Sequence, residues 1–249
     1  MTVTQINNAN TSSLTNSQTS SQATTSASPV SQAMQKAEAR IQAQIDSTSA
    51  QLSSFGKLKS AVSDAQLAAK ALGGLTAASS TADVKAAANS FLTKFNAAIK
   101  TAKTTATVPG GSAAEASGAA RVTTELSRAI SSTPANLDAL RKIGFKQLSD
   151  GTLTLDASKF DAAQKADPTA VQSALAKIGQ LVDSTTTKEL ATGGKVSDSM
   201  ASLGQRASAL KSQQTAIQTM VQKLSSTTST TSTTNTGYVG YGLSAYLSN

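Results

Sequence analysis

The fold is decided by residues 200–224, which read MASLGQRASALKSQQTAIQTMVQKL. Apolar residues recur there in alternating steps of three and four positions, through four repeats. The positions are Met200, Leu203, Ala207, Leu210, Gln214, Ile217, Val221 and Leu224. This heptad pattern predicts a helix over 197–224 with one apolar stripe, as in a coiled-coil seam, and its polar member Gln214 is a candidate for fixing register. Such a stripe needs a partner helix.

A second heptad segment covers residues 31–72 and offers that partner. One row recurs at every seventh residue, and a second row runs beside it until Lys59 and Gln66 interrupt it. The rows are Met34, Ile41, Thr48, Phe55, Val62 and Ala69, and Ile45 with Leu52. Because the two segments lie toward opposite ends of the chain, we expect them to pack antiparallel as one rod, with the 200–224 seam on the 34–69 stripe.

The residues between the two segments read as shorter elements. Apolar periodicity, Gly and Pro breakers, and the cap pairs Thr133-Pro134 and Asp167-Pro168 place the helices. We expect them at 82–103, 114–131, 134–142, 157–165 and from 168 to about 183. Asp150-Gly151 is a favoured hairpin turn in the alternating stretch 145–156. The predicted fold is mainly α: an antiparallel coiled coil of N- and C-terminal helices, with shorter packed helices and one small β-hairpin.

The two ends of the chain have a different composition. Residues 1–30 are almost wholly Ser, Thr, Asn, Gln and Ala, and the tail 225–249 is Ser/Thr-rich before it carries all three tyrosines. Such segments bury too little apolar surface to offset the entropy of ordering, so we expect a disordered arm and a flexible tail around a helical domain at 31–224.

The heptad stripes fit two interpretations equally well. They are either the core of a monomeric helical bundle or an oligomeric interface, and the polar arms favour the second because such tails often order on assembly. The candidate assembly residues are Met34, Ile41, Ile45, Leu52, Phe55, Val62, Met200, Leu203, Leu210, Ile217, Val221 and Leu224.

The amino-acid composition excludes most catalytic, disulfide and metal-binding chemistry. The chain has no cysteine and no histidine, which removes disulfides, thiolate nucleophiles, usual zinc sites and the best proton-transfer group near neutral pH. Asp150 and Asp156 lack EF-hand spacing, and Gly73-Gly74, Gly110-Gly111 and Gly193-Gly194 lack the P-loop pattern. We therefore expect no enzyme, no metal and no cofactor.

The charge and hydropathy of the chain argue against nucleic-acid and membrane partners. The net charge of +8 comes from scattered Lys and Arg without interleaved aromatics, and aromatics are only 3% of residues. This predicts a solvated basic surface and no nucleic-acid site. The N-terminus has no basic or apolar region of a secretory signal, and no stretch is long enough to span a membrane, so we expect no membrane partner.

Three motifs in order carry a resemblance to a known family. They are LDALRKIGF at 137–145, DGTLTLDASKF at 150–160 and ADPTAVQSAL at 166–175, preceded by SFLTKFNA at 90–97. This arrangement resembles the C-terminal region of flagellar hook-associated protein 2, the filament-capping (FliD) family. The heptad segments at 31–72 and 197–224 look like that family's terminal helices.

The resemblance implies a structural protein of the bacterial flagellum, secreted unfolded through the type III export channel. It implies a leg domain of paired terminal helices in a homo-oligomer at the filament tip, where it helps flagellin assemble. The implied partners are a second copy of the chain, flagellin, hook–filament junction proteins and an export chaperone.

One departure from the family concerns the segment after the first heptad helix. Family members normally carry a β-rich head there, whereas Gly73-Gly74 passes directly to Ala82. The resemblance therefore supports the leg domain better than the full capping activity. An alternative is a type III exported coiled-coil effector or binding protein that acts on a host partner, for which the 143–156 signature has no role.

Overall fold

The computed structural model describes residues 29–76 and 78–230, with side chains described at 30–76 and 78–224. This part of the chain is mainly helical with one antiparallel hairpin. The elements are α1 (Pro29–Gly73), α2 (Thr81–Ala106), α3 (Ala113–Ile130), α4 (Pro134–Lys142), β1 (Phe145–Gln147), β2 (Leu153–Leu155), α5 (Ala157–Ala166), α6 (Pro168–Leu190) and α7 (Lys195–Thr230).

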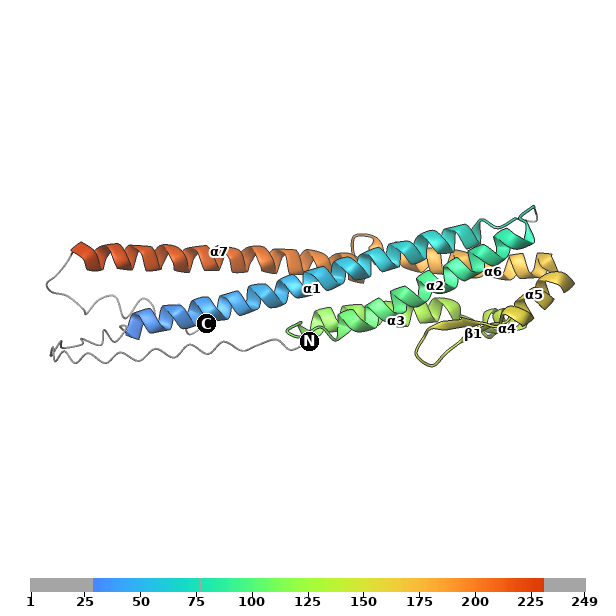
Figure 1. Ribbon diagram of the computed structural model, residues 1–249, viewed down its shortest axis with the longest axis horizontal. Coiled ribbons are helices and arrows are strands. Elements are labelled where there is room, and N and C mark those ends of the chain that lie inside the picture. The colour runs from blue at the N-terminus through green and yellow to red at the C-terminus, as the bar shows by residue number, and fades with distance from the viewer. Residues whose placement is uncertain (1–28, 77, 231–249) are drawn as a thin grey trace, which may run out of the picture.

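The long helix α1 is the axis of the molecule. Its 45 residues extend roughly 67 Å at 1.5 Å per residue. Helices α6 and α7 lie end to end along it and run antiparallel to it (Figure 1). Hydrogen bonds join Gln66 to Thr187 at 2.7 Å and Gln42 to Gln214 at 2.8 Å, so α6 faces the second half of α1 and α7 faces the first.

A helical hairpin of α2 and α3 completes the thick part of the molecule. Its helices begin at side-chain caps: Ser80 accepts the Asp83 N–H, and Ser112 with Glu115 forms a reciprocal capping box. The predicted caps Thr133 and Asp167 likewise accept backbone N–H groups at the starts of α4 and α6, and Asp156 does so at the start of α5. Local sequence chemistry therefore sets most helix starts.

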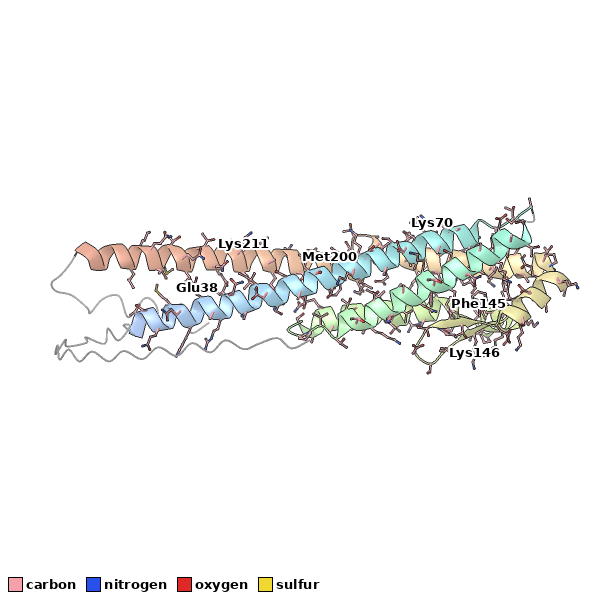
Figure 2. The ribbon with its side chains drawn as sticks, viewed as in Figure 1. Glu38, Lys70, Phe145, Lys146, Met200 and Lys211 are labelled. Carbon is pink, nitrogen blue, oxygen red and sulfur yellow. The ribbon has the colours of Figure 1, made fainter. Side chains whose placement is uncertain are left out.

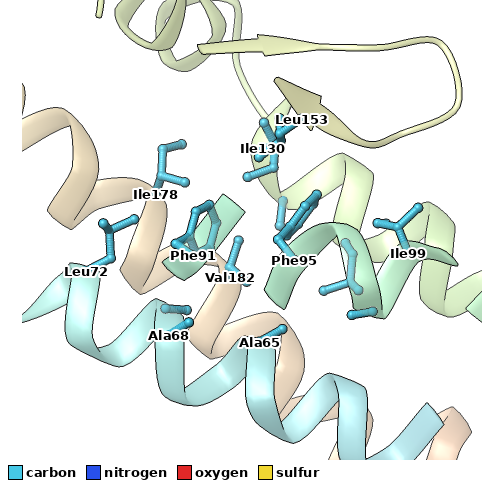
Figure 3. Close-up of a cluster of buried hydrophobic side chains, with 14 of the residues drawn as sticks. Ala65, Ala68, Leu72, Phe91, Phe95, Ile99, Ile130, Leu153, Ile178 and Val182 are labelled. Carbon is cyan, nitrogen blue, oxygen red and sulfur yellow. The ribbon is translucent and has the colours of Figure 1, made fainter. Parts of the chain in front are cut away.

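The main core lies where α1, α2, α3 and α6 meet. Phe91 and Phe95 of α2 lie with their rings tilted and 5.6 Å between ring centroids; Phe91 points toward Ile178 and Val182 of α6 (Figure 3). Ile130 of α3 and Leu153 of β2 close the same cluster from the other side. Each of these side chains is almost fully buried. These side chains thus form one apolar cluster shared by the helices and β2.

The hairpin and two short helices occupy the end of the molecule remote from α7 (Figure 1). Strands β1 and β2 pair antiparallel with Phe145 opposite Leu155 and Gln147 opposite Leu153. Phe145 packs against Phe160 of α5, edge to face, with centroids 6.3 Å apart. The hairpin therefore presents one apolar face to the core.

The helices begin and end close to the predicted positions, with three extensions, one of which is α6, predicted to end near 183 and ending at Leu190. Helix α1 begins at Pro29, inside the range predicted as an arm, and α7 continues to Thr230, inside the range predicted as a tail. The rest of both predicted arms, 1–28 and 231–249, lies outside the described residues. Among the described helices, none combines the length and apolar content needed to cross a membrane.

Candidate assembly surface

Two helices alone form one end of the molecule, which we call the stalk: α1 residues 29–47 with α7 residues 206–230. The remaining elements form the part that we call the bundle. Figure 1 shows α7 and the start of α1 extending beyond the α2–α3 hairpin. The hairpin connection reaches α1 at Ser47, whose hydroxyl donates to the Gly110 carbonyl at 3.2 Å. On α7, the Arg206 guanidinium lies 3.9 Å from the Glu115 carboxylate of α3. Beyond these two contacts, Figure 1 shows α1 and α7 extending side by side without a third described helix.

The predicted seam residues are buried to different extents. Buried are Met34, Phe55, Val62, Leu203, Leu210 and Ile217; partly buried are Ile41, Ile45, Leu52, Met200 and Leu224; Val221 is exposed. Met200 lies on α7 near its start, where the bundle passes into the stalk (Figure 2). The seam is thus closed at the bundle and partly open toward the far end of the stalk.

A polar clamp sets the register of the stalk. The Gln214 Nε2 donates to Gln42 Oε1 at 2.8 Å, and Gln42 Nε2 donates to Asp46 Oδ1 at 2.8 Å. Both bonds lie on the exposed side of the stalk, so a one-turn slip of α7 would exchange the first of them for bonds to water. A polar residue on a seam favours one register at some cost in stability. Gln214, singled out in the sequence, is therefore placed where it can favour a single register.

The structure corrects the partner expected for the second half of the α1 stripe. Phe55 and Val62 belong to the bundle core with α2 and α6, and the bond from Gln66 to Thr187 puts this half of α1 on α6. Helix α7 covers the first half only. The expectation that the 200–224 seam packs along all of 34–69 is wrong beyond Phe55, because α6 occupies that length of α1.

The second row of the α1 stripe is also displaced. Leu58, Ala65 and Leu72 are fully buried, whereas Lys59 is exposed. The expected row continues from Leu52 to Lys59 and Gln66, but the buried residues Leu58 and Ala65 each come one position earlier. A shift of one position turns the buried row by about 100° around the helix axis. Lys59 and Gln66 therefore do not interrupt the core. The row changes because α1 changes its neighbours near Gln51, a buried polar residue.

The outer part of the stalk carries apolar surface that the described chain does not cover. Met220 and Val221 are 36% and 37% exposed, and Ile41 on α1 is only partly buried. Adjacent half-exposed large side chains on a two-helix rod are typical of a surface that another helix or copy completes. The candidate assembly residues on the stalk thus fall where such a contact is possible.

The predicted hairpin turn lies on the bundle. Gly151 adopts φ +86°, and the Asp150 carboxylate accepts the N–H and hydroxyl of Thr152. Leu148 and Thr152 close a three-residue loop, since the Leu148 N–H donates to the Thr152 carbonyl at 2.8 Å. The bonds from Thr152, then the nearby Lys103, lower the pKa of Asp150. These contacts use the carboxylate to shape a turn.

Asn96 is a structural residue that the sequence did not single out. Its Oδ1 accepts the Leu153 N–H at 2.7 Å and its Nδ2 donates to the Leu153 carbonyl at 2.8 Å. This pair of bonds fixes β2 to α2 as a third strand would. The sequence does carry a sign of this role: Asn96 follows Phe95 on the buried side of a predicted helix, where a polar side chain needs a hydrogen-bond partner.

One buried carboxylate lies at the junction of α6 and α7. Burial raises the pKa of Glu189. The hydrogen bond from the Lys195 backbone N–H lowers this pKa, and the negative charge of Glu125 raises it further. The Glu189 Oε2 accepts the Lys195 backbone N–H at 3.2 Å, a structural bond at the start of α7. Within residues 29–76 and 78–230, no cluster of three or more acidic, His or Cys side chains is positioned to hold a metal.

Comparison with known proteins gives one match. The family model described as flagellar hook-associated protein 2 C-terminus matches residues 65–236, which is more than half of the chain. Searches of curated proteins and of solved structures give no match. The matched range begins in the second half of α1 and includes the bundle, the hairpin and all of α7.

Proposed function

Because this chain belongs to the flagellar hook-associated protein 2 family, we propose that it is a structural, self-assembling component of the bacterial flagellum that acts at the filament tip and aids flagellin assembly. The family match over residues 65–236 carries the proposal. In this reading the chain is not an enzyme, and it reaches the filament as a secreted protein through the type III export channel.

The shape of the molecule supports a role in assembly. The bundle is a closed core, while the stalk is a long two-helix rod whose outer side chains Met220 and Val221 are half exposed. A rod of this kind gains most stability by packing beside other rods. We propose that copies of the chain associate through the stalk, next to flagellin and the hook–filament junction proteins, after release from an export chaperone.

The direct connection from α1 to α2 limits the form of the proposed cap. Only residues 74–80 join α1 to α2, so the leg domain has no inserted head at this point. We propose a reduced cap, in which the bundle end takes the place where a head is otherwise attached. The capping contacts would then be made by the bundle and the stalk themselves.

A deletion strain tests the proposal. We expect a strain without the gene to lose motility and to release unpolymerised flagellin into the medium, and expression of the chain to restore filaments. Complementation with Leu210→Asp and Ile217→Asp should fail, while the exposed pair Ser212→Asp and Thr219→Asp on the same helix should restore motility. Normal filaments in the deletion strain would refute the capping role and favour a host-directed exported protein.

A further inference from the structure

A hollow of about 540 Å³ lies on the outer face of the hairpin, at the bundle end. Its lining comes from α4, β1, β2 and the start of α5. Figure 2 shows Phe145 and Lys146 at this end, far from the stalk residues Glu38 and Lys211. The hollow is therefore separate from the assembly surface described above.

Three cationic side chains from three elements line the hollow. Arg141 comes from α4, Lys146 from β1 and Lys159 from α5, and all three are exposed. In the described part of the chain no ion pair is formed by Lys146 or Lys159, and the pair from Arg141 to Asp138 is a 3.4 Å contact on the open surface. Exposed pairs of this kind contribute little and separate easily.

One carboxylate lines the same hollow and is already engaged. The Asp156 Oδ1 accepts the Lys159 N–H at 3.0 Å, as the cap of α5. The hollow therefore keeps an excess of positive charge. An anionic group that enters it would meet cations on three sides.

The backbone holds these cations in a fixed arrangement. Lys146 pairs with Thr154 across the hairpin, so both project to the outer face, while Phe145 is buried beneath them. Gly144 at the strand start has φ +89°, and its carbonyl accepts the Asp156 N–H at 2.9 Å. These elements are anchored in the core, so the backbone positions of the three cations are fixed, while their exposed side chains lose rotamer freedom on binding.

We propose that this basic hollow binds an acidic segment of another protein. Its volume is in the range of small-molecule pockets and far exceeds a single phosphate, which favours several carboxylates presented together. The aromatic side chain in its lining, Phe145, is 2% exposed and has no face free to stack a nucleobase. This inference stands independently of the capping proposal.

The sequence itself indicates that the acidic segment comes from a different protein. Residues 1–28 and 231–249 contain no Asp or Glu. Elsewhere the acidic residues are isolated, and the nearest two in the sequence, Asp156 and Asp161, lie five positions apart. A second copy carries the same net charge of +8 and the same isolated acidic residues, so it offers the hollow no cluster of carboxylates. The required partner is one with clustered carboxylates.

A fluorescently labelled peptide with four consecutive glutamates tests the proposal on the full chain. We expect its anisotropy to report saturable binding at low salt that weakens as salt is added, because screening reduces exposed charge interactions. A peptide with glutamine in place of glutamate should not bind. The triple variant Arg141→Glu, Lys146→Glu and Lys159→Glu should lower the affinity at least tenfold.

The matched control reverses three exposed lysines elsewhere: Lys57→Glu, Lys59→Glu and Lys100→Glu. This control should change the affinity less than threefold, while circular dichroism verifies that both variants fold. If the control loses as much affinity as the hollow variant, binding reflects net charge and the proposal is wrong. Competition by inorganic phosphate at the peptide's own concentration would also overturn it, by indicating a simple anion site.

Discussion

The bundle and the stalk share helix α1 but bury it in different ways. All five phenylalanines of the chain lie buried in the bundle, where the second half of α1 meets α2 and α6. In the stalk, α1 meets α7 alone, and only Met34, Leu210 and Ile217 are buried among its described side chains. One continuous helix therefore joins a closed core to a thin rod.

The stability of the two regions therefore depends on different interactions. Each large buried side chain of the bundle contributes about 1.5–3 kcal/mol by leaving water. The stalk has few such residues, and long helices with so little buried surface are marginal without further packing. We therefore expect the bundle to fold independently and the stalk to be the part that assembly stabilises.

The largest effect is expected from charge in the stalk seam. Leu210→Asp with Ile217→Asp puts two carboxylates at buried positions, and each charge costs several kcal/mol there without a partner. The double variant should lose α1–α7 pairing in the stalk, lower the helix signal in circular dichroism and abolish assembly measured by light scattering. The unfolding midpoint of the bundle should stay close to that of the unchanged chain.

The control for this pair is Ser212→Asp with Thr219→Asp, at exposed positions of the same helix. It adds the same charge and should retain both mass and helix content. If the Leu210 and Ile217 variant keeps the oligomeric mass and helicity of the unchanged chain, the seam is not the assembly surface.

The next largest effect is expected in the bundle. Phe95→Ala removes a fully buried ring between α1, α3 and α6 and should lower the free energy of unfolding by about 3–5 kcal/mol. Leu67→Ala removes a side chain on α1 that is 66% exposed and should change it by no more than about 0.5 kcal/mol. Urea denaturation followed by circular dichroism measures both. Equal losses would contradict the placement of the core.

The sequence predicts the elements of both regions well, because their signals are local. Heptad spacing gives the two long helices, and Thr133-Pro134 and Asp167-Pro168 give helix starts through capping chemistry. Asp150-Gly151 likewise lies in the hairpin connection, since a left-handed backbone favours glycine. None of these features needs knowledge of distant contacts.

The sequence alone does not show which helices pack against each other. The change of partner along α1 depends on α6 lying end to end with α7, and this follows from the short joint at 191–194. A single heptad register extended past Phe55 omits Leu58 and makes Lys59 an interruption, because the register does not include the change of partner. The basic hollow was missed for the same reason, because Arg141, Lys146 and Lys159 meet only in the folded chain.

A smaller effect separates two glycines with nearly the same backbone. Gly144 has φ +89° and Gly193 has φ +87°, so alanine is strained at both by about 1–2 kcal/mol. A Cβ at Gly144 would lie 2.7 Å from the Asp156 carbonyl oxygen, whereas Gly193 has open space. Gly144→Ala should therefore lower the free energy of unfolding by about 3 kcal/mol in all, and Gly193→Ala by about 1. Thermal and urea unfolding measure the difference, and equal costs would contradict the tight approach at Gly144.

The smallest effect is expected inside the bundle, at the joint between α6 and α7. Burial raises the pKa of Glu189 above its ordinary value of 4.5, so the folded protein holds this proton more tightly than the unfolded chain does. The contribution to stability is therefore full below about pH 4.5 and is lost as pH rises through the folded pKa. Glu189→Gln keeps an oxygen for the Lys195 N–H without the charge, and should raise the free energy of unfolding at pH 7 by up to about 1 kcal/mol.

Urea denaturation between pH 4 and pH 8 tests this sign. The two proteins should converge at the acid end and separate above it. Glu125→Gln, which removes the neighbouring charge that adds to the rise, should produce a smaller gain with the same direction. A Glu189→Gln protein that is less stable at pH 7 would mean that the carboxylate stabilises the start of α7 through its bond to Lys195 by more than its burial costs. In that case the hydrogen bond from Lys195 would fix the start of α7 to the end of α6 inside the bundle, and so set the direction in which α7 leaves the bundle for the stalk.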